Sequence, residues 1–269
     1  MWNGHQIKRE VKDSLNREII YQYPPKRIIS LVPSITELLY DLEVGEYIVA
    51  TTDYCIYPEQ ARNTTKIGGT KTPDIDKIYR LKPDIVIAEK NENSKNRVLK
   101  IAEKFPVFVF DVRSFDDAIN MIRTVGDLVG KKPLGRIISE KIMQKFIDYA
   151  IDFQQKTVFF PVWKNPYITI SKDTFISSFL QLLNLRNIFE NKEKAYPKIT
   201  IEELKANCPD FIFLPDEPYS FTPEDAAELK ALCPNSEIVF VKGEMFIWFG
   251  SRLLKAADYI KNLHQKLFK

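Results

Sequence analysis

The chain has 269 residues, of which 45% are hydrophobic and 28% charged, and its formal net charge is +3. This length allows one large domain or two smaller ones, and the small, scattered charge argues against a nucleic-acid partner. No apolar run approaches the ~20 residues that cross a bilayer, so we expect no membrane insertion. The first ten residues lack the apolar segment of a secretory signal peptide, which predicts a cytoplasmic location.

The three cysteines, Cys55, Cys208 and Cys233, are widely spaced and form no CxxC pair. We therefore expect neither a disulfide framework nor a structural zinc site, and the odd count favours a reducing compartment. Cys55 has no evident histidine to activate it, so a small buried hydrophobic role is favoured over a nucleophile.

The first half of the chain predicts a hairpin followed by alternating strands and helices. The hairpin spans 11–26 with a turn near Asn16, a buried strand covers 27–32, and a helix covers 35–42. Ser34 and Glu37 have the spacing of a capping box at the start of that helix. The remaining elements are strands at 47–52, 85–88 and 107–110 and helices at 74–81 and 115–129.

A long helix is predicted from Lys132 to Lys156, between the two halves of the chain. Its apolar residues recur every three or four positions, and Pro133 suits its first turn. Because a helix rises 1.5 Å per residue, it would be ~35 Å long. Such a helix is too long for an ordinary crossover, and we interpret it as a strut.

The second half repeats the pattern of the first. It contains predicted strands at 157–162, 211–214 and 238–241 and helices at 175–185, 201–206 and 250–268. The segment 75–87 aligns with 201–213, and both contain Pro-Asp before a strand. Pro-Asp is common loop chemistry, but three units in the same order favour pseudo-symmetry. Alternation of strands and helices predicts an α/β fold of two Rossmann-like lobes with mainly parallel sheets. The expected boundaries are 1–26, 27–131, 132–156 and 157–269.

Several kinds of catalytic chemistry are absent from the sequence. There is no phosphate-binding loop, no GxGxxG after a strand and no GxSxG elbow. The two histidines, His5 and His264, lie in the terminal segments and cannot form a histidine-rich metal site. We therefore expect a binding protein rather than an enzyme, although carboxylate-only catalysis stays open at this stage.

The loops at the carboxyl ends of the predicted strands are rich in aromatic residues. Because ligands of open α/β sheets bind at these ends, two facing lobes would form one ligand cleft. Tyr54, Trp163, Tyr196 and Trp248 would suit a large, flat, partly apolar ligand with a few polar groups. The alternative is that these aromatic residues close the lobe interface or pack beneath loops.

Two motifs and the long helix carry a resemblance to a known family. Arg27-Ile-Ile-Ser-Leu-Val-Pro-Ser-Ile-Thr-Glu-Leu and Leu81-Lys-Pro-Asp-Ile-Val-Ile-Ala resemble the class III substrate-binding proteins of ABC importers. This helical-backbone metal-receptor group includes vitamin B12-binding and ferric siderophore-binding proteins. The resemblance covers roughly residues 11–269, and it implies a metal chelate as ligand, a periplasmic location and no covalent cofactor or bound metal ion. We expect a monomer. The alternative is a cytosolic metal-chelate handling protein or enzyme on the same fold.

The resemblance also implies roles for particular residues. The cleft of the B12-binding relative corresponds here to Tyr54, Thr70, Tyr196, Glu244 and Trp248, to which the aromatic lining adds Trp163. Thr70 replaces an aromatic residue and Trp248 an arginine, so a corrinoid, a ferric siderophore and haem all stay open as ligands. Asp76 and Glu202 match the acidic residues that dock onto arginines of a two-fold ABC transporter permease. Their alternative role is that of solvated carboxylates favoured by the dipole in the first turn of a helix.

Overall fold

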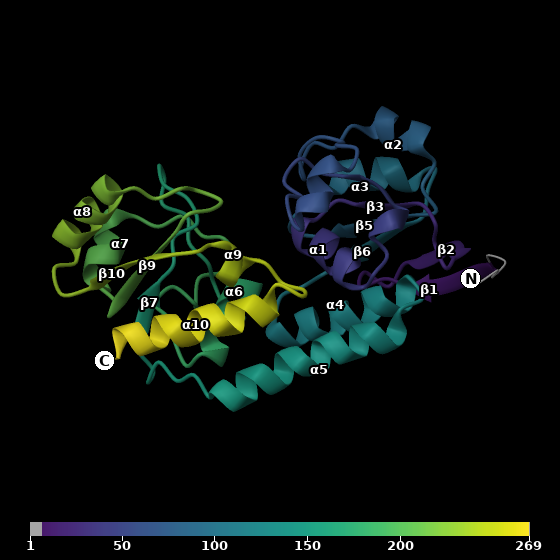
Figure 1. Cartoon of the computed structure of the whole chain (residues 1–269). Helices are drawn as coiled ribbons and strands as arrows, with labels where there is room; N and C mark the ends of the chain where they lie inside the picture. The colour runs from purple at the N-terminus through teal and green to yellow at the C-terminus, as the bar shows by residue number, and fades with distance from the viewer. Residues whose placement is uncertain (1–6, 269) are drawn as a thin grey trace. The chain divides into compact units, whose positions relative to one another are not determined.

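The computed structural model describes residues 7–268, which form two compact units (Figure 1). The first unit contains the chain up to Val112, Asp117–Ile142 and Gly250–Arg252. The second contains Arg113–Asp116, Met143–Phe249 and the residues from Leu253 onward. Within residues 7–268, no helix has the length and apolar composition that a bilayer crossing requires.

The first unit is built on a four-stranded parallel sheet of strand order β4-β3-β5-β6. The residues of these strands are buried except for Val49, which is partly buried, as expected where helices cover both faces of a parallel sheet. On one face, Ile29, Val86 and Val107 pack with Ile78 of α2 and Ile101 of α3. The strands are β3 (Ile28–Ser30), β4 (Ile48–Thr51), β5 (Ile85–Glu89) and β6 (Val107–Phe110), and the helices are α1 (Pro33–Asp41), η1 (Gly45–Tyr47), η2 (Glu59–Asn63), α2 (Ile75–Leu81), α3 (Lys95–Ala102) and α4 (Phe115–Leu128).

The predicted N-terminal hairpin is present but begins earlier than expected. Strands β1 (Ile7–Lys12) and β2 (Glu18–Tyr23) pair antiparallel, and Asn16 has the positive φ of 60° that a tight turn requires. Tyr21 is buried, and its hydroxyl donates to the Leu128 carbonyl (2.9 Å), which attaches the hairpin to α4.

The second unit has a parallel sheet of strand order β8-β7-β9-β10. On one face, Phe159 and Ile212 pack with Leu204 of α7 and Leu229 of α8. The strands are β7 (Thr157–Phe159), β8 (Arg186–Asn187), β9 (Phe211–Pro215) and β10 (Glu237–Val241), and the helices are α6 (Phe175–Leu182), α7 (Ile201–Ala206), α8 (Pro223–Leu232), α9 (Glu244–Ile247) and α10 (Leu253–Leu267).

The two sheets have the same strand order, with β3 and β7 in corresponding places. In both, the aspartate of a Pro-Asp pair accepts hydrogen bonds from groups at the start of that strand. The Asp84 carboxylate accepts the backbone N–H groups of Lys26 (2.7 Å) and Arg27 (3.0 Å) just before β3. The Asp210 carboxylate accepts the N–H and the hydroxyl of Thr157, both at 2.7 Å, at the start of β7. The predicted α/β fold with two parallel sheets is confirmed.

The linking helix is shorter than predicted. Helix α5 (Lys132–Tyr149) ends seven residues before Lys156, because the next residue, Ala150, has a φ of 44° that leaves the helical region. The following turn buries Phe153 against Phe211 and Phe213 of the second sheet, a position that a continuing helix would not provide. Residues 132–142 of the helix belong to the first unit and the remainder to the second.

The predicted capping box at the start of α1 is wrong. The N-cap residue is Val32, with no side-chain hydrogen bond, and Pro33 is the first helical residue. Because the helix starts two residues earlier than predicted, Glu37 lies inside it and is buried. Its carboxylate accepts a hydrogen bond from Nε of Arg252 (2.7 Å), and the Arg252 guanidinium lies 4.0 Å from the centre of the Tyr57 ring. Glu37 is therefore half of a buried ion pair within the first unit.

Candidate functional site

The carboxyl ends of the parallel strands form one edge of each sheet. In the first unit the chain passes from β3 outward to β4 and then back across to β5, and in the second from β7 to β8 and back to β9. Ligands of open α/β sheets bind at such a switch point, beyond the carboxyl ends of the strands. Each unit therefore offers one candidate binding edge.

Tyr54 and Thr70 lie in neighbouring loops at the edge of the first sheet. Tyr54 follows β4, and its side chain is 62% exposed. A Cβ placed on Gly69 would lie 3.5 Å from Cε2 of Tyr54, so the ring lies against the turn that leads into Thr70. The structure brings these two predicted residues together, and their contact with a ligand stays a prediction.

Asn93 connects three loops at the same edge. Its Nδ2 donates to the carbonyl of Leu31 after β3 (3.1 Å) and to that of Thr70 (3.0 Å), and its Oδ1 accepts the N–H of Glu89 (2.9 Å). Because Asn93 is buried, we assign it to loop positioning rather than to ligand contact.

A role for Glu89 was not predicted from the sequence. Glu89 is the last residue of β5, it is buried, and its carboxylate accepts the backbone N–H groups of Asn91 (2.6 Å), Glu92 (2.8 Å) and Val112 (3.2 Å). Burial raises the pKa of the Glu89 carboxyl to about 7, against the opposing effect of these N–H donors. A lone carboxylate directly after the apolar run Ile85–Ala88 was the available signal.

The edge of the second sheet carries two tryptophans, each in contact with the loop after β9. Trp163, after β7, is 45% exposed, and its ring meets that of Tyr219 edge-on with centroids 5.6 Å apart. Trp248, after α9, donates its indole N–H to Oε1 of Glu217 (2.6 Å). Trp163 and Trp248 thus occupy the predicted edge, whereas the contact with Glu217 could not be predicted from the sequence.

Glu244 and Tyr196 occupy other loops of the same unit. Glu244 is the first residue of α9 and is half-buried. Tyr196 is 44% exposed in the loop after β8, between Ala195 and Pro197. The carbonyls of these two neighbours accept the N–H groups of Ser171 (2.9 Å) and Thr169 (3.1 Å). Both predicted residues therefore follow strands of the second sheet, and their ligand contacts stay predictions.

Asp76 and Glu202, the predicted docking residues, occupy equivalent places. Each is exposed and is the second residue of its helix, Asp76 in α2 and Glu202 in α7. Asp74 caps the first helix by accepting the N–H of Lys77 (2.9 Å), and Thr200 caps the second by accepting that of Glu203 (3.1 Å). The two carboxylates are thus presented in the same way, although a docking role stays a prediction.

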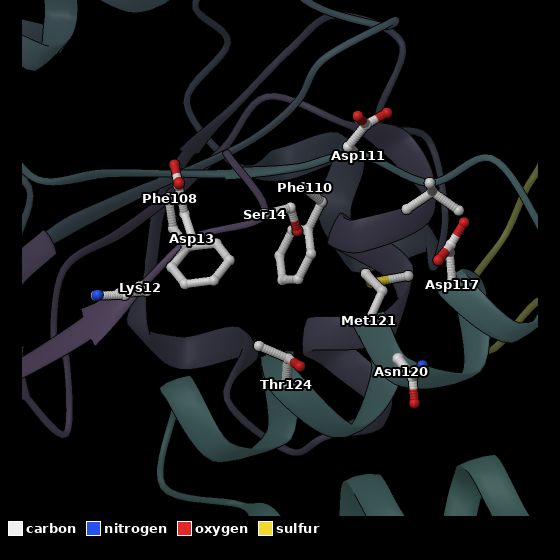
Figure 2. Close-up of a pocket in the computed structure, with 11 residues that line it drawn as sticks. Lys12, Asp13, Ser14, Phe108, Phe110, Asp111, Asp117, Asn120, Met121 and Thr124 are labelled. Carbon is white, nitrogen blue, oxygen red and sulfur yellow. The ribbon is translucent and has the colours of Figure 1, made fainter. Parts of the chain in front are cut away.

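Two cavities lie away from the predicted ligand residues. One of about 180 Å³ lies in the first unit beside β6 and α4 (Figure 2), and its wall includes Asp13, Phe108, Phe110 and Asp117. Another of about 210 Å³ lies in the second unit between the loop after β8 and α7. No residue predicted to contact a ligand lines either of them.

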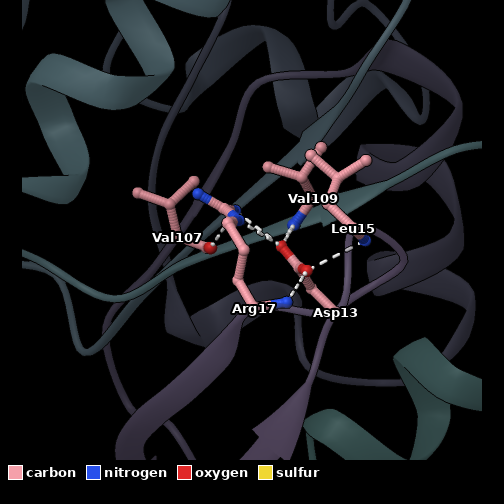
Figure 3. A network of polar contacts seen from close by, with 5 residues as sticks. All are labelled: Asp13, Leu15, Arg17, Val107 and Val109. Carbon is pink, nitrogen blue, oxygen red and sulfur yellow. Dashed lines mark hydrogen bonds and ion pairs between the residues drawn. The ribbon is translucent and has the colours of Figure 1, made fainter.

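The carboxylate of Asp13, in the wall of the first cavity, is occupied by structural contacts (Figure 3). Oδ1 accepts the N–H groups of Leu15 (2.9 Å) and Arg17 (3.0 Å), and Oδ2 accepts Nε of Arg17 (2.9 Å) and the N–H of Val109 (3.3 Å). The Arg17 guanidinium also donates to the Val107 carbonyl (3.0 Å). Asp13 therefore fastens the hairpin turn to β6.

The described residues offer neither a metal cluster nor an activated thiol. No group of three or more His, Cys, Asp or Glu side chains within residues 7–268 could hold a metal ion. His5, one of the two histidines, lies outside these residues. Cys55 is buried, the Thr36 hydroxyl donates to its sulfur (3.1 Å), and burial raises the pKa of the thiol. Cys55 is thus the buried small residue that the sequence predicted.

The expectation that the cysteines form no disulfide is wrong. Cys208, just before β9, is bonded to Cys233, at the end of α8, with their Cα atoms 5.5 Å apart. The sequence separation of 25 residues concealed the pair, because the packing of α7 beside α8 brings the two cysteines together. A disulfide persists in oxidising compartments, so the inference of a reducing one also loses its basis.

The sequence matches the family described as periplasmic binding protein over residues 28–232. The chain belongs to this family. The match begins at β3 and ends at the last residue of α8, so it includes both parallel sheets apart from β10.

Relatives in the periplasmic binding protein family include a vitamin B12-binding protein of Vibrio cholerae, 28% identical over 195 residues that cover 71% of each chain. An uncharacterised ABC transporter substrate-binding lipoprotein of Bacillus subtilis is 28% identical over 218 residues, which cover 77% of this chain and 68% of the relative. A crystal structure of a periplasmic vitamin B12-binding protein of Vibrio cholerae matches with a TM-score of 0.78 at 25% identity, covering 91% of this chain and 99% of that one.

These comparisons confirm the resemblance that the motifs indicated. The relatives are binding proteins rather than enzymes, and the function of the chain is accordingly the binding of a solute. They do not support the cytoplasmic location that the first residues predicted, because the family is described as periplasmic and one relative as a lipoprotein.

Proposed function

We propose that this protein delivers a metal chelate to an ABC-type importer, outside the cytosol. A corrinoid is the first candidate ligand, since the Vibrio cholerae relatives bind vitamin B12, and ferric siderophores and haem are the alternatives. The disulfide between Cys208 and Cys233 supports an oxidising location.

The observation that carries the ligand class is the aromatic edge of the second sheet. Trp163 and Trp248 extend from the loops after β7 and β10, and Tyr219 lies between these loops in sequence, after β9. Indole rings combine a large apolar face with one polar N–H, which suits a broad chelate whose rim carries amide or hydroxyl groups. Tyr54 and Thr70 are the residues that we assign to the same ligand from the first unit.

Titration of the purified protein tests this proposal. Cyanocobalamin, ferrioxamine B and haemin are each added while heat release and visible absorbance are followed. We expect one of them to bind saturably with a stoichiometry of one, and replacement of both tryptophans by alanine to weaken that binding at least ~30-fold. Tyr79→Ala serves as a control, because Tyr79 lies in α2, away from either candidate edge. Flat titrations with all three chelates would refute the proposal.

Asp76 and Glu202 are the residues that we assign to the transporter. Both are exposed at the second position of a short helix, and they occupy corresponding places in the repeated units. A transporter with two-fold symmetry presents the same basic side chain twice, so each of the two equivalent carboxylates could form an ion pair with one of them.

Charge reversal tests the docking role. Asp76→Lys together with Glu202→Lys should abolish capture by the cognate permease in detergent or nanodiscs and leave chelate affinity unchanged. Exposed Glu103, which terminates α3, provides the matched control as Glu103→Lys. Retained capture by the double variant would remove the docking role without affecting the ligand proposal.

A further inference from the structure

The loop after β9 contacts both tryptophans of the second unit. Its Glu217 accepts the indole N–H of Trp248 (2.6 Å), and its Tyr219 meets the ring of Trp163 with centroids 5.6 Å apart. One loop, residues 216–221, therefore connects two aromatic side chains that come from different segments of the chain.

Several contacts hold this loop in one conformation. The Asp216 carboxylate accepts the N–H of Gly243 (2.8 Å) and pairs with Lys242 (2.9 Å), which joins the loop to the segment after β10. Phe221 is buried in the core of the unit, and its ring lies 4.7 Å from that of Tyr219. The loop is therefore anchored on both sides of Glu217 and Tyr219.

Close packing at Gly243 defines the position of Glu217 further. A Cβ at Gly243 would lie 2.6 Å from Cγ and 2.8 Å from the carbonyl oxygen of Glu217, so only glycine allows this approach. The carboxylate thus has a defined place from which to accept the indole N–H. A hydrogen bond to a charged acceptor is stronger than one between neutral groups, and it fixes the plane of the ring.

The chain next to Trp163 is held in place as well. The next residue, Lys164, is bonded to Asp225 and to Glu228 of α8, both at 2.6 Å, and the Tyr167 hydroxyl donates to Glu228 (3.2 Å). The loop after β7 is therefore fastened to α8, while Tyr219 meets the one large exposed ring of that loop.

We infer that Glu217 and Tyr219 are positioning residues that orient Trp248 and Trp163 for the face of a flat chelate. This inference rests on the proposed function and deepens it. A ring that is fixed before binding loses less conformational freedom when the ligand arrives, so affinity rises although neither positioning residue needs to touch the ligand. We expect this gain in affinity for ligands with a broad, rigid, partly apolar face, such as a corrin or a porphyrin.

Two double-mutant cycles test the inference with the chelate that the wild-type protein binds among cyanocobalamin, ferrioxamine B and haemin. Glu217→Ala should weaken binding roughly tenfold, and Tyr219→Ala roughly fivefold. In a Trp248→Ala background, Glu217→Ala should have almost no further effect, and Tyr219→Ala should behave likewise in a Trp163→Ala background. The crossed pairs, Glu217 with Trp163 and Tyr219 with Trp248, should be additive.

The conservative variant and a spectroscopic signature separate positioning from mere folding. Glu217→Gln keeps an oxygen that can accept the indole N–H, so its affinity should stay within about threefold of wild type. The ¹H–¹⁵N signal of the Trp248 indole should shift strongly in Glu217→Ala, and also in double variants that combine Glu217→Ala with another substitution and keep Trp248. The signal of the Trp163 indole should not shift in those of these variants that keep Trp163.

The outcomes are distinguishable. Suppose that the wild type binds one chelate. The inference is overturned, while the proposed function stands, if Glu217→Ala binds that chelate as tightly as the wild type does. The same holds if Glu217→Ala weakens binding as much in the Trp248→Ala background as in the wild-type background. If no chelate binds the wild type, the proposed function fails and the positioning role fails with it, even when the indole signal confirms the contact.

Discussion

The two units share a topology but are stabilised by different chemistry. Both have the same order of parallel strands, and both fasten the start of the central strand with an aspartate that follows a proline. The first unit adds a buried ion pair, Glu37 with Arg252, whereas the second adds a disulfide and a cluster of phenylalanines around β9. The comparison indicates that strand order and the aspartate contacts define the fold, and that the remaining interactions can be exchanged.

The candidate binding edges differ in the same way. At the end of β5 the first unit has buried Glu89, which binds backbone N–H groups, while the second has Pro215 at the end of β9, which has no ionisable group. The first edge exposes one tyrosine, and the second exposes aromatic rings held by the loop after β9. We therefore expect aromatic contacts at the edge of the second sheet, and a pH-dependent stability in the first unit.

The largest expected effect is that of breaking the ion pair of the first unit. Arg252→Met leaves the Glu37 carboxylate buried without the guanidinium, so we expect the free energy of unfolding to fall by about 4 kcal/mol. Urea denaturation followed by circular dichroism measures it. Arg136→Met is the matched control, because the Arg136–Glu140 pair is exposed and its loss should have little effect on the free energy of unfolding. Similar values for the two variants would show that the buried pair is not important.

Removal of the disulfide should affect the second unit next. Cys208 and Cys233 are separated by 25 residues, so replacing both by serine should lower the free energy of unfolding by about 3 kcal/mol. A reductant should lower the melting temperature of the wild type and leave that of the double variant unchanged. Detection of three free thiols in unreduced, denatured wild-type protein would contradict the assignment.

A pH effect should distinguish the first unit. The pKa of Glu89 is raised from 4.5 to about 7 by burial, so the folded protein keeps a proton that the unfolded chain releases between these values. The free energy of unfolding should therefore fall as the pH rises from about 4.5 to 7, by roughly 3 kcal/mol, and stay low above it.

Glu89→Gln isolates this contribution from those of other titrating groups. The difference in free energy of unfolding between wild type and variant should change across pH 4.5–7 and be constant above. A difference that is independent of pH would mean that the N–H donors of Asn91, Glu92 and Val112 keep the carboxylate ionised throughout.

Most of the fold could be predicted from local patterns, and the errors have identifiable physical causes. Apolar runs located the buried strands, and the helix predicted from residue 175 does begin there, where Thr174 accepts the N–H of Ser177 (3.2 Å). Helix α8 was missed although Thr222, Pro223 and Asp225 carry the full signal of a capping box with proline at the first position. Helix α5 was overextended because burial of Phe153 depends on tertiary contacts that periodicity does not report.

For the candidate site, only the positions of its loops could be predicted. The rule that ligands bind at carboxyl ends of strands identified the loops of Tyr54, Trp163 and Trp248. It could not identify Glu217 or Glu89, because a carboxylate acquires its role from a partner distant in sequence: Trp248 lies 31 positions from Glu217, and Val112 lies 23 from Glu89. The disulfide was missed for the same reason.

The smallest expected effect tests the shared feature itself. Asp84→Ala and Asp210→Ala each remove the acceptor for groups at the start of a central strand, Arg27 in one unit and Thr157 in the other. Because both aspartates are only partly buried, each variant should lose about 1–2 kcal/mol in urea denaturation, and the two losses should be equal within about 0.5 kcal/mol. Asp116→Ala, exposed in α4, should be neutral within the same margin. If only one of the two variants lost free energy of unfolding, the Pro-Asp repeat would be a similarity of sequence without a common structural role. The starts of β3 and β7 would then be held by different interactions.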